Sequence, residues 1–256
     1  MQVHLSYWQK RLFFIQVCFV LWTGIAFSQQ VRIHSHNDYH QAEPLHNAIR
    51  NQAWSIEADI YLAGDKILVA HDTEELASAP SLEDLYLNPI QKLFKQNRGR
   101  ISKARDYAPV LMIDIKSEAG TTLPALIRIF EPYTRIFNPV KKKKAVKVII
   151  SGDRGSPESW LQWPSWLYFD GRPTEEYNAP TLERVGLISD SYSKYADDFD
   201  QIRSVSNLAH GQSKLLRLWG APDETTSWDR LKDLGVDIIN TDRVMECRRY
   251  FGGRDE

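Results

Sequence analysis

The sequence predicts a single (β/α)8 barrel of the TIM type, in the α/β class. Short apolar runs alternate with longer amphipathic stretches, the alternation repeats eight times, and polar residues stand at the ends of several runs. This pattern is typical of parallel strands covered by helices, and barrel enzymes carry their chemistry at the carboxyl ends of their strands. The competing open, doubly wound sheet usually has a glycine-rich turn after its first strand, and the sequence has none there.

Residues 1–28 are expected to be a signal peptide, followed by the barrel domain at 31–256. Two basic residues precede an apolar run at 12–27, and small residues near Ser28 suit a signal peptidase. An uncleaved membrane anchor is the less favoured alternative, because the run is shorter than the roughly 20 residues that span a bilayer. The prediction is therefore an exported protein, periplasmic or secreted.

The composition indicates an ordinary globular protein of 256 residues, with 43% hydrophobic and 25% charged residues. The formal net charge is -1, so there is no basic excess that would indicate a nucleic-acid partner. Four lysines at 141–144 are expected to form a solvated turn, because polybasic membrane signals are usually longer or paired with an anchor. We expect a monomer that binds a small molecule and makes at most peripheral contact with a membrane.

The predicted strands begin after the signal segment and recur through the chain. They are residues 31–36, 55–62, 110–116, 146–151, 166–170, 185–190, 215–219 and 236–241, with 67–71 as an extension of the second. Helices are expected at 44–51, 81–96, 123–137, 196–210 and 226–234. Proline is permitted in the first turn of a helix, which favours a start at Pro44, and Ser81 and Asp84 have capping-box spacing.

Acidic residues on two predicted strands indicate a metal site. Glu57 and Asp59 lie two apart, and a strand sends such residues to the same face. Two buried carboxylates repel each other, and a divalent cation resolves the conflict. Asp114 and Lys116 share a face of the next barrel strand, either as a structural ion pair or with Asp114 as a third oxygen ligand. Three acids against one lysine favour the metal, and oxygen ligands favour Mg²⁺ or Ca²⁺.

Two histidines close predicted strands that point towards the same mouth of the barrel. Cleavage of a phosphodiester needs one group to activate the nucleophile and one to protonate the leaving oxygen. Histidines with a pKa near neutrality suit both tasks, so His34 and His71 are the predicted catalytic pair. A single histidine at a strand end is more often structural. These two are favoured as catalytic residues because their strands point towards the same mouth.

The motifs together resemble the PLC-like phosphodiesterase superfamily, which includes glycerophosphodiester phosphodiesterases and phosphatidylinositol-specific phospholipase C. Those motifs are His34-Ser-His36-Asn37, Glu57-Ala-Asp59, His71-Asp72, Asp114-Ile-Lys116 and the segment 235–243 that ends in Asp242-Arg243. The resemblance implies a barrel, a divalent metal and histidine acid/base catalysis on a phosphodiester.

The chain departs from the glycerophosphodiesterase pattern at two motifs. Those enzymes have His-Arg-Gly and Pro-Glu-Asn, whereas this chain has Ser35 and Leu45 at the second positions, so a phosphate-binding arginine and a metal-binding glutamate are missing. The remaining pattern is closer to the altered-inheritance-of-mitochondria proteins and the sphingomyelinase D-like branch. That branch implies Glu57, Asp59 and Asp114 as metal ligands, His34 and His71 as the acid/base or nucleophilic pair, and Lys116 and Asn37 as substrate contacts.

Later strand ends offer further candidates. Asp170, which closes the fifth barrel strand, is predicted to line the pocket or to cap the following turn. Trp219, at the end of the seventh, is predicted to stack over a substrate headgroup or to plug the barrel mouth. Asp242 and Arg243 are expected to form a structural ion pair.

The prediction is an exported, metal-dependent phosphodiesterase acting on a glycerophosphodiester-like or phospholipid-like substrate. One alternative is a metallohydrolase like the polymerase-and-histidinol-phosphatase proteins, in which His34 and His36 would bind zinc. Another is a secreted barrel that binds a ligand without catalysis.

Overall fold

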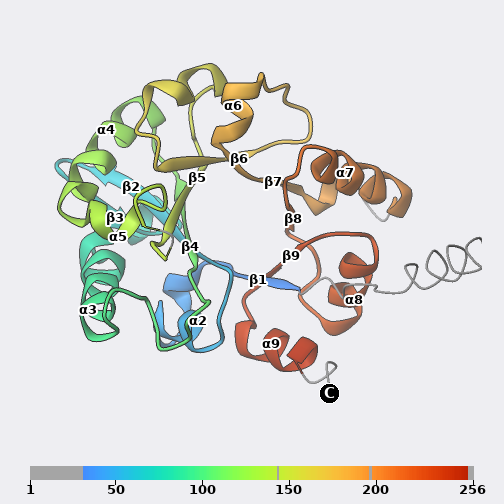
Figure 1. Cartoon of the computed structure of the whole chain (residues 1–256), viewed down its shortest axis with the longest axis horizontal. Helices are drawn as coiled ribbons and strands as arrows, with labels where there is room; N and C mark the ends of the chain where they lie inside the picture. Colours follow the sequence, from blue (N-terminus) through green and yellow to red (C-terminus); the bar gives the residue numbers. More distant parts are fainter. Residues whose placement is uncertain (1–30, 143, 196–197, 253–256) are drawn as a thin grey trace, which may run out of the picture. The chain divides into compact units, whose positions relative to one another are not determined.

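Eight parallel strands form a closed barrel (Figure 1). The computed structural model describes residues 31–142, 144–195 and 198–252. The barrel strands are β1 (Arg32–Ser35), β2 (Ser55–Ala63), β4 (Val110–Ile115), β5 (Lys147–Gly152), β6 (Leu167–Gly171), β7 (Val185–Ser191), β8 (Leu216–Trp219) and β9 (Ile238–Thr241). Because β1 pairs in parallel with both β2 and β9, the sheet closes on itself, and the predicted (β/α)8 barrel is confirmed.

An additional strand extends β2 beyond the barrel. β3 (Lys66–Val69) pairs antiparallel with β2, as the run at 67–71 predicts. The predicted signal peptide lies outside the described residues. Within the part of the chain that the structure describes, none of the helices combines the length and the apolar character needed to cross a membrane.

The helices surround the barrel (Figure 1). They are α2 (His46–Arg50), α3 (Asn88–Gln96), α4 (Ala119–Phe130), α5 (Thr134–Phe137), α6 (Ala179–Arg184), α7 (Phe199–Gly211), α8 (Thr225–Asp233) and α9 (Val244–Gly252). Helices α6 and α9 were not predicted from the sequence. α6 has six residues, too few to display a helical period, and it is fixed by Asn178, whose side chain accepts a hydrogen bond from the Thr181 backbone N–H. The predicted helix at 123–137 is interrupted by a 3-10 turn at Glu131–Tyr133 that contains proline.

The interior of the barrel has an apolar layer below a polar one. The apolar layer consists of Val110, Met112, Ile149, Leu187 and Ile238. Two residues further along four of these strands stand Asp114, Ser151, Ser189 and Asn240. Because residues two apart point to the same side of a strand, the apolar side chains close the barrel towards its amino-terminal end and the polar ones line its carboxyl end. Outward residues such as Ile56 and Ile60 belong to the main core beneath the helices.

Candidate active site

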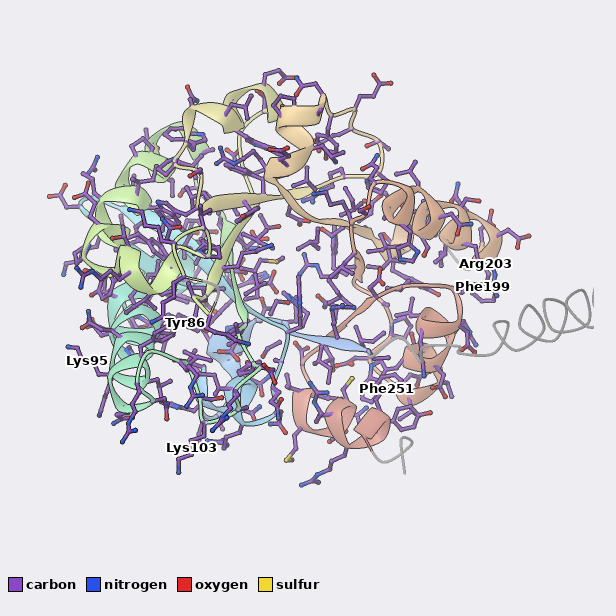
Figure 2. The ribbon with its side chains drawn as sticks, viewed as in Figure 1. Tyr86, Lys95, Lys103, Phe199, Arg203 and Phe251 are labelled. Carbon is purple, nitrogen blue, oxygen red and sulfur yellow. The ribbon has the colours of Figure 1, made fainter. Side chains whose placement is uncertain are left out.

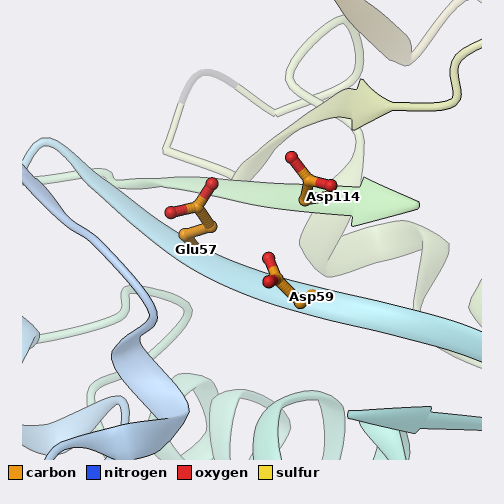
Figure 3. A group of neighbouring side chains, drawn as sticks. All are labelled: Glu57, Asp59 and Asp114. Carbon is orange, nitrogen blue, oxygen red and sulfur yellow. The ribbon is translucent and has the colours of Figure 1, made fainter. Parts of the chain in front are cut away.

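Three carboxylates meet at the carboxyl end of the barrel, on the neighbouring strands β2 and β4 (Figure 3). Glu57, Asp59 and Asp114 each offer an oxygen within 4.8 Å of the others. The register that pairs Asp59 with Asp114 brings the two strands together at this level. Burial and the charges of Glu57 and Asp114 raise the pKa of Asp59 to about 6. The cluster is therefore an acidic site that favours a cation.

Lys116 supplies part of the positive charge that the cluster needs. Its Nζ atom lies 3.0 Å from Asp59 Oδ2 and 3.2 Å from Asp114 Oδ1. Burial alone would lower the pKa of Lys116, but the two carboxylates outweigh it and raise the pKa to about 12. Asp59 Oδ1 is nevertheless buried without a hydrogen-bond partner among the described residues. A buried carboxylate oxygen without a donor fits a metal ligand, so this donor set suits a hard divalent cation.

His34 is fully buried beneath the carboxylate cluster. Its Nδ1 atom lies 2.6 Å from Ser55 Oγ, and its Nε2 atom lies 2.7 Å from Arg217 Nη1 and 3.0 Å from Glu57 Oε2. Burial and the charge of Arg217 lower the pKa of His34 to about 4, so the ring is neutral at pH 7. Protein groups engage both ring nitrogens, and the side chain has no exposed surface.

His36 lies two residues further along the chain, at the mouth of the barrel, and its side chain is 35% exposed. Its Nδ1–H donates to Asp242 Oδ1 over 2.8 Å, and its Nε2 atom lies 4.0 Å from Glu57 Oε2. Burial alone would lower the pKa of His36, but the hydrogen bond to Asp242 and the charge of Glu57 raise it above its usual value. An accessible imidazole held by a carboxylate beside an acidic cluster is the arrangement of an acid/base catalyst.

His71 follows β3, and its side chain is 45% exposed. Its Nδ1 atom lies 3.2 Å from Asp72 Oδ2, and its backbone N–H donates to Glu75. The preceding residue, Ala70, donates its backbone N–H to the carbonyl of Asp59. His71 therefore lies just beyond the paired part of β3, beside strand β2, which bears Glu57 and Asp59. Its side chain is exposed.

A second charged network fills the barrel interior next to the carboxylates. Asp170 is fully buried, accepts hydrogen bonds from Ser151 and Ser189, and forms an ion pair of 2.9 Å with Arg172. Arg217 reaches towards both networks, because its Nη1 and Nη2 atoms each lie 3.7 Å from a carboxylate, those of Glu57 and Asp170 respectively. Asp170 thus lies inside the barrel, where it pairs with arginines and does not face solvent.

Two further predicted contacts lie around the rim. The Asn37 side chain accepts a hydrogen bond from the Tyr39 hydroxyl, which lies 3.0 Å from Asp59 Oδ2. The backbone N–H of Asn37 points at Glu57 Oε2 over 3.4 Å. Trp219 ends β8 with 43% of its surface exposed. Asn37 is therefore tied to the carboxylate cluster, whereas Trp219 is free to contact a ligand at the mouth.

The structure corrects the expected ion pair between Asp242 and Arg243. Asp242 instead accepts from His36, and Arg243 pairs with Glu246. Adjacent residues on an extended chain point to opposite sides, which separates the two side chains. The pairing of β1 with β9 brings His36 to Asp242, and that pairing has no local sequence signal.

Asp38 and Arg217 also belong to this site, although the sequence did not predict a role for either residue. Asp38 is fully buried and accepts hydrogen bonds from the Leu45 backbone N–H and the hydroxyls of Ser35 and Tyr86, which fixes the loop after β1. Arg217 lies within a predicted strand among apolar residues, and a charged residue inside such a run was an available signal.

Comparisons with known proteins agree with this arrangement. Residues 26–144 match the family model of the AIM6-like phosphodiesterase domain. The chain is 26% identical to the altered inheritance of mitochondria protein 6 of Eremothecium gossypii, over 86% of this chain and 69% of that protein. It is 24% identical to a homologue of that protein in Arthroderma benhamiae, over 86% of this chain and 84% of the relative.

Solved structures share the fold. A glycerophosphodiester phosphodiesterase from Parabacteroides distasonis has a TM-score of 0.60 at 16% identity, covering 89% of this chain and 99% of that chain. A protein described as a glycerophosphoryl diester phosphodiesterase, from Agrobacterium tumefaciens, has a TM-score of 0.51 at 14% identity, covering 89% and 100%. The family match, the relatives and the shared fold confirm the resemblance to the PLC-like phosphodiesterase superfamily that the motifs predict.

Proposed function

We propose that the chain is an exported, monomeric, metal-dependent phosphodiesterase that acts on a glycerophosphodiester-like or phospholipid-like substrate. The observation that carries the proposal is the position of His36, an accessible imidazole whose Nε2 atom lies 4.0 Å from Glu57 in the carboxylate cluster. The signal-like first 28 residues support export, and the near-neutral charge gives no reason to expect a nucleic-acid substrate.

The carboxylates of Glu57, Asp59 and Asp114 would hold Mg²⁺ or Ca²⁺. When bound, such an ion supplies Lewis-acid stabilisation of charge on a phosphate oxygen. The ammonium of Lys116 lies on the same two aspartates and provides a fixed positive charge for a second phosphate oxygen. Arg217 is enclosed in the barrel, so it stabilises the negative charge of Glu57 and Asp170 rather than contacting substrate.

The acid/base roles follow from exposure. We assign them to His36 and His71, whose rings reach the surface at the carboxyl end of the barrel. One accepts the proton of the attacking hydroxyl, and the other protonates the leaving alkoxide. His34 was the sequence-based choice for the first role, but its burial and its contacts with Ser55 and Arg217 favour a positioning role for it.

The two alternatives lead to different expectations. Zinc bound by His34 and His36 would need a free lone pair on His34, yet both of its ring nitrogens are engaged and a guanidinium lies 2.7 Å from Nε2. A non-catalytic barrel would not need an accessible imidazole held by a carboxylate, which is what His36 and Asp242 provide.

The decisive test is whether a divalent metal restores turnover to protein from which a chelator has removed metal. Hydrolysis of bis(p-nitrophenyl) phosphate and of glycerophosphocholine, lysophosphatidylcholine and sphingomyelin would be measured after adding Mg²⁺, Ca²⁺ or Zn²⁺. We expect Mg²⁺ or Ca²⁺ to restore turnover, and His36→Ala and His71→Ala to abolish it. His46→Ala is the matched control, because His46 lies away from the cluster on α2.

Other results would redirect the proposal. Restoration by Zn²⁺ alone would favour the metallohydrolase, and no turnover of any phosphodiester would favour the binding barrel. Phosphorus NMR of the product would distinguish attack by water from attack by an internal hydroxyl, because the second reaction yields a cyclic phosphate.

A further inference from the structure

Two loops at the amino-terminal end of the barrel form one basic surface. The first joins α3 to β4 and the second joins α5 to β5, so both precede their strands. Lys144 Nζ in the second loop donates to Asp106 Oδ1 in the first over 3.2 Å. Lys142 Nζ lies 5.3 Å from the centre of the Phe94 ring at the end of α3. The loops are therefore adjacent, although about forty residues separate them in the chain.

We call this surface the basic face. It consists of Lys95, Arg98, Arg100, Lys103, Arg105, Lys141, Lys142 and Lys144, of which all but Arg100 and Lys144 are exposed. Figure 2 shows Lys95 and Lys103 at the edge of the molecule, directed away from the barrel.

The positive charge of the basic face is unusual for this chain. Residues 92–106 and 138–144 contain ten lysines and arginines but one acidic residue, Asp106. The whole chain has 32 basic and 33 acidic residues, so the rest of the protein carries an acidic excess. A concentrated positive field on an otherwise acidic protein attracts an anionic partner at this end of the barrel.

An exposed apolar residue lies among these cations. Val140 is 67% exposed, the highest value among the large hydrophobic side chains of the described chain, and it stands between Pro139 and Lys141 in a turn. An anionic bilayer provides headgroups for the lysines and an apolar layer for Val140. A nucleic acid offers no apolar layer, and its bases stack on aromatic side chains, whereas the exposed large aromatics of the described residues, Phe199 and Trp219, lie elsewhere.

We propose that the basic face binds the surface of an anionic lipid bilayer, with Val140 entering the interfacial layer. The four lysines at 141–144 were expected to form only a solvated turn, because alone they are a short run. The loop at 98–105 adds the charge that this run lacks. Glu57, Asp59 and Asp114 lie at the opposite end of the barrel, so the mouth would face the aqueous phase. The proposal does not depend on the proposed catalytic activity.

The test is co-sedimentation with vesicles in EDTA, which removes divalent bridging. Vesicles of phosphatidylglycerol and phosphatidylcholine in equal parts would be compared with pure phosphatidylcholine. Both the full chain and the barrel unit Val31–Glu256, which contains the nine strands of the described residues, would be measured. The apolar residues 12–27 are absent from the barrel unit, so any binding to neutral vesicles that they cause would be seen with the full chain alone. We expect binding to anionic vesicles that weakens as salt concentration rises.

The informative variant combines Lys103→Glu, Arg105→Glu and Lys141→Glu, exposed residues whose side chains make no hydrogen bond or ion pair within the described chain. It should bind anionic vesicles about a hundredfold more weakly, since each basic residue near such a surface contributes about a fivefold gain in affinity. A control that combines Lys66→Glu, Arg128→Glu and Arg249→Glu makes the same change in net charge elsewhere and should lose much less. Val140→Ser should also weaken binding, with an unchanged melting temperature.

Four results would overturn the proposal. Equal binding of neutral and anionic vesicles by the barrel unit, or no binding of either, removes the role of charge. A loss caused by Trp219→Ala, rather than by the basic-face variant, would place the membrane contact at the carboxyl end of the barrel, where Trp219 is exposed. Tighter binding of single-stranded DNA than of anionic vesicles would identify a nucleic-acid partner instead.

Discussion

The Nδ1–H group of His36 donates a hydrogen bond of 2.8 Å to Asp242 Oδ1, across 206 residues of sequence. The two residues follow β1 and β9, which are neighbours where the barrel closes. The bond holds the imidazole with its Nε2 atom 4.0 Å from Glu57 Oε2. Closure of the barrel therefore orients the histidine that we assign to acid/base catalysis.

Replacing Asp242 should impair turnover without removing a group that touches substrate. Asp242→Asn keeps the size of the side chain but loses the charge that orients His36 and stabilises its protonated form. We expect kcat to fall at least about tenfold, with little change in KM, because a carboxylate that holds a catalytic imidazole acts through it. Steady-state kinetics on bis(p-nitrophenyl) phosphate would measure this. Unchanged kcat would exclude the positioning role.

His34 and His36 should differ in what their loss does to stability. His34→Ala removes one buried polar partner from each of Ser55, Glu57 and Arg217 and opens a cavity, so we expect a loss of about 2–4 kcal/mol. His36→Ala removes a ring that is only partly buried and should change the free energy of unfolding by about 0.5 kcal/mol or less. Urea unfolding at pH 7 would compare them. A stable His34→Ala protein without activity would return the catalytic role to His34.

Asp59→Asn should prevent metal binding without unfolding the protein. The substitution removes one of three mutually repelling carboxylates, so it should stabilise the chelated protein by about 1–2 kcal/mol. Mg²⁺ or Ca²⁺ should raise the melting temperature of the native protein, because a ligand that binds the folded state stabilises it, but not that of the variant. Differential scanning calorimetry with and without EDTA would show both effects. Asp65→Asn, an exposed acid outside the cluster, is the control.

The buried Asp170 should make stability depend on acid pH. Burial alone would raise its pKa, but the charges of Arg172 and Arg217 outweigh it and hold the pKa below the usual value. A depressed carboxyl pKa gives stability that is complete above the unfolded-state pKa of about 4 and is lost as the pH falls through the folded-state value. Asp170→Asn removes the anion between the buried guanidinium of Arg217 and the partly buried guanidinium of Arg172, and it should cost roughly 3–5 kcal/mol at pH 7.

The check is urea unfolding of both proteins at pH values from 7 to 3. The difference in free energy of unfolding between them should be constant near neutrality and shrink in the acid range. A difference that grows as the pH falls would contradict the assigned charge network.

The thiol of Cys247 should be unreactive in the folded protein. It is fully buried in α9, and burial raises its pKa to about 12. Because the thiolate is the reactive form, Ellman's reagent at pH 8 should label it slowly in the native protein and rapidly in urea. The unit Val31–Glu256 would be used because Cys18 lies outside it, and rapid labelling of this folded unit would show that α9 opens readily.

Much of the barrel could be predicted because the strands follow from local patterns of polar and apolar residues. Glu57 and Asp59 alternate with Ile56 and Ala58, so one face of β2 had to be polar and the other apolar. The same alternation on β4 predicts that Asp114 joins them, and the structure brings the three together. The boundaries of the predicted strands differ from the observed ones by a residue or two, because strand ends depend on their neighbours.

The different positions of His34 and His36 could not be predicted from the local sequence. His34 and His36 are two apart and share a face, so alternation predicts the same direction for both. Depth in the barrel separates them: His34 lies at the level of Ser55 and Arg217, whereas His36 lies beyond the end of β1, beside Asp242. Depth depends on which strands are neighbours and in what register, and those facts arise only when the sheet closes.

The sequence by itself determined the fold class, the order of the strands and the acidic cluster, because alternation along one strand and the spacing of motifs are properties of short segments. The tertiary structure alone decided that His36 is accessible and held by Asp242, that His34 is enclosed, and that the loops bearing Lys103 and Lys141 form one basic face. Each of these depends on contacts between segments far apart in the chain. Such contacts are set by barrel closure and register, which no short segment encodes.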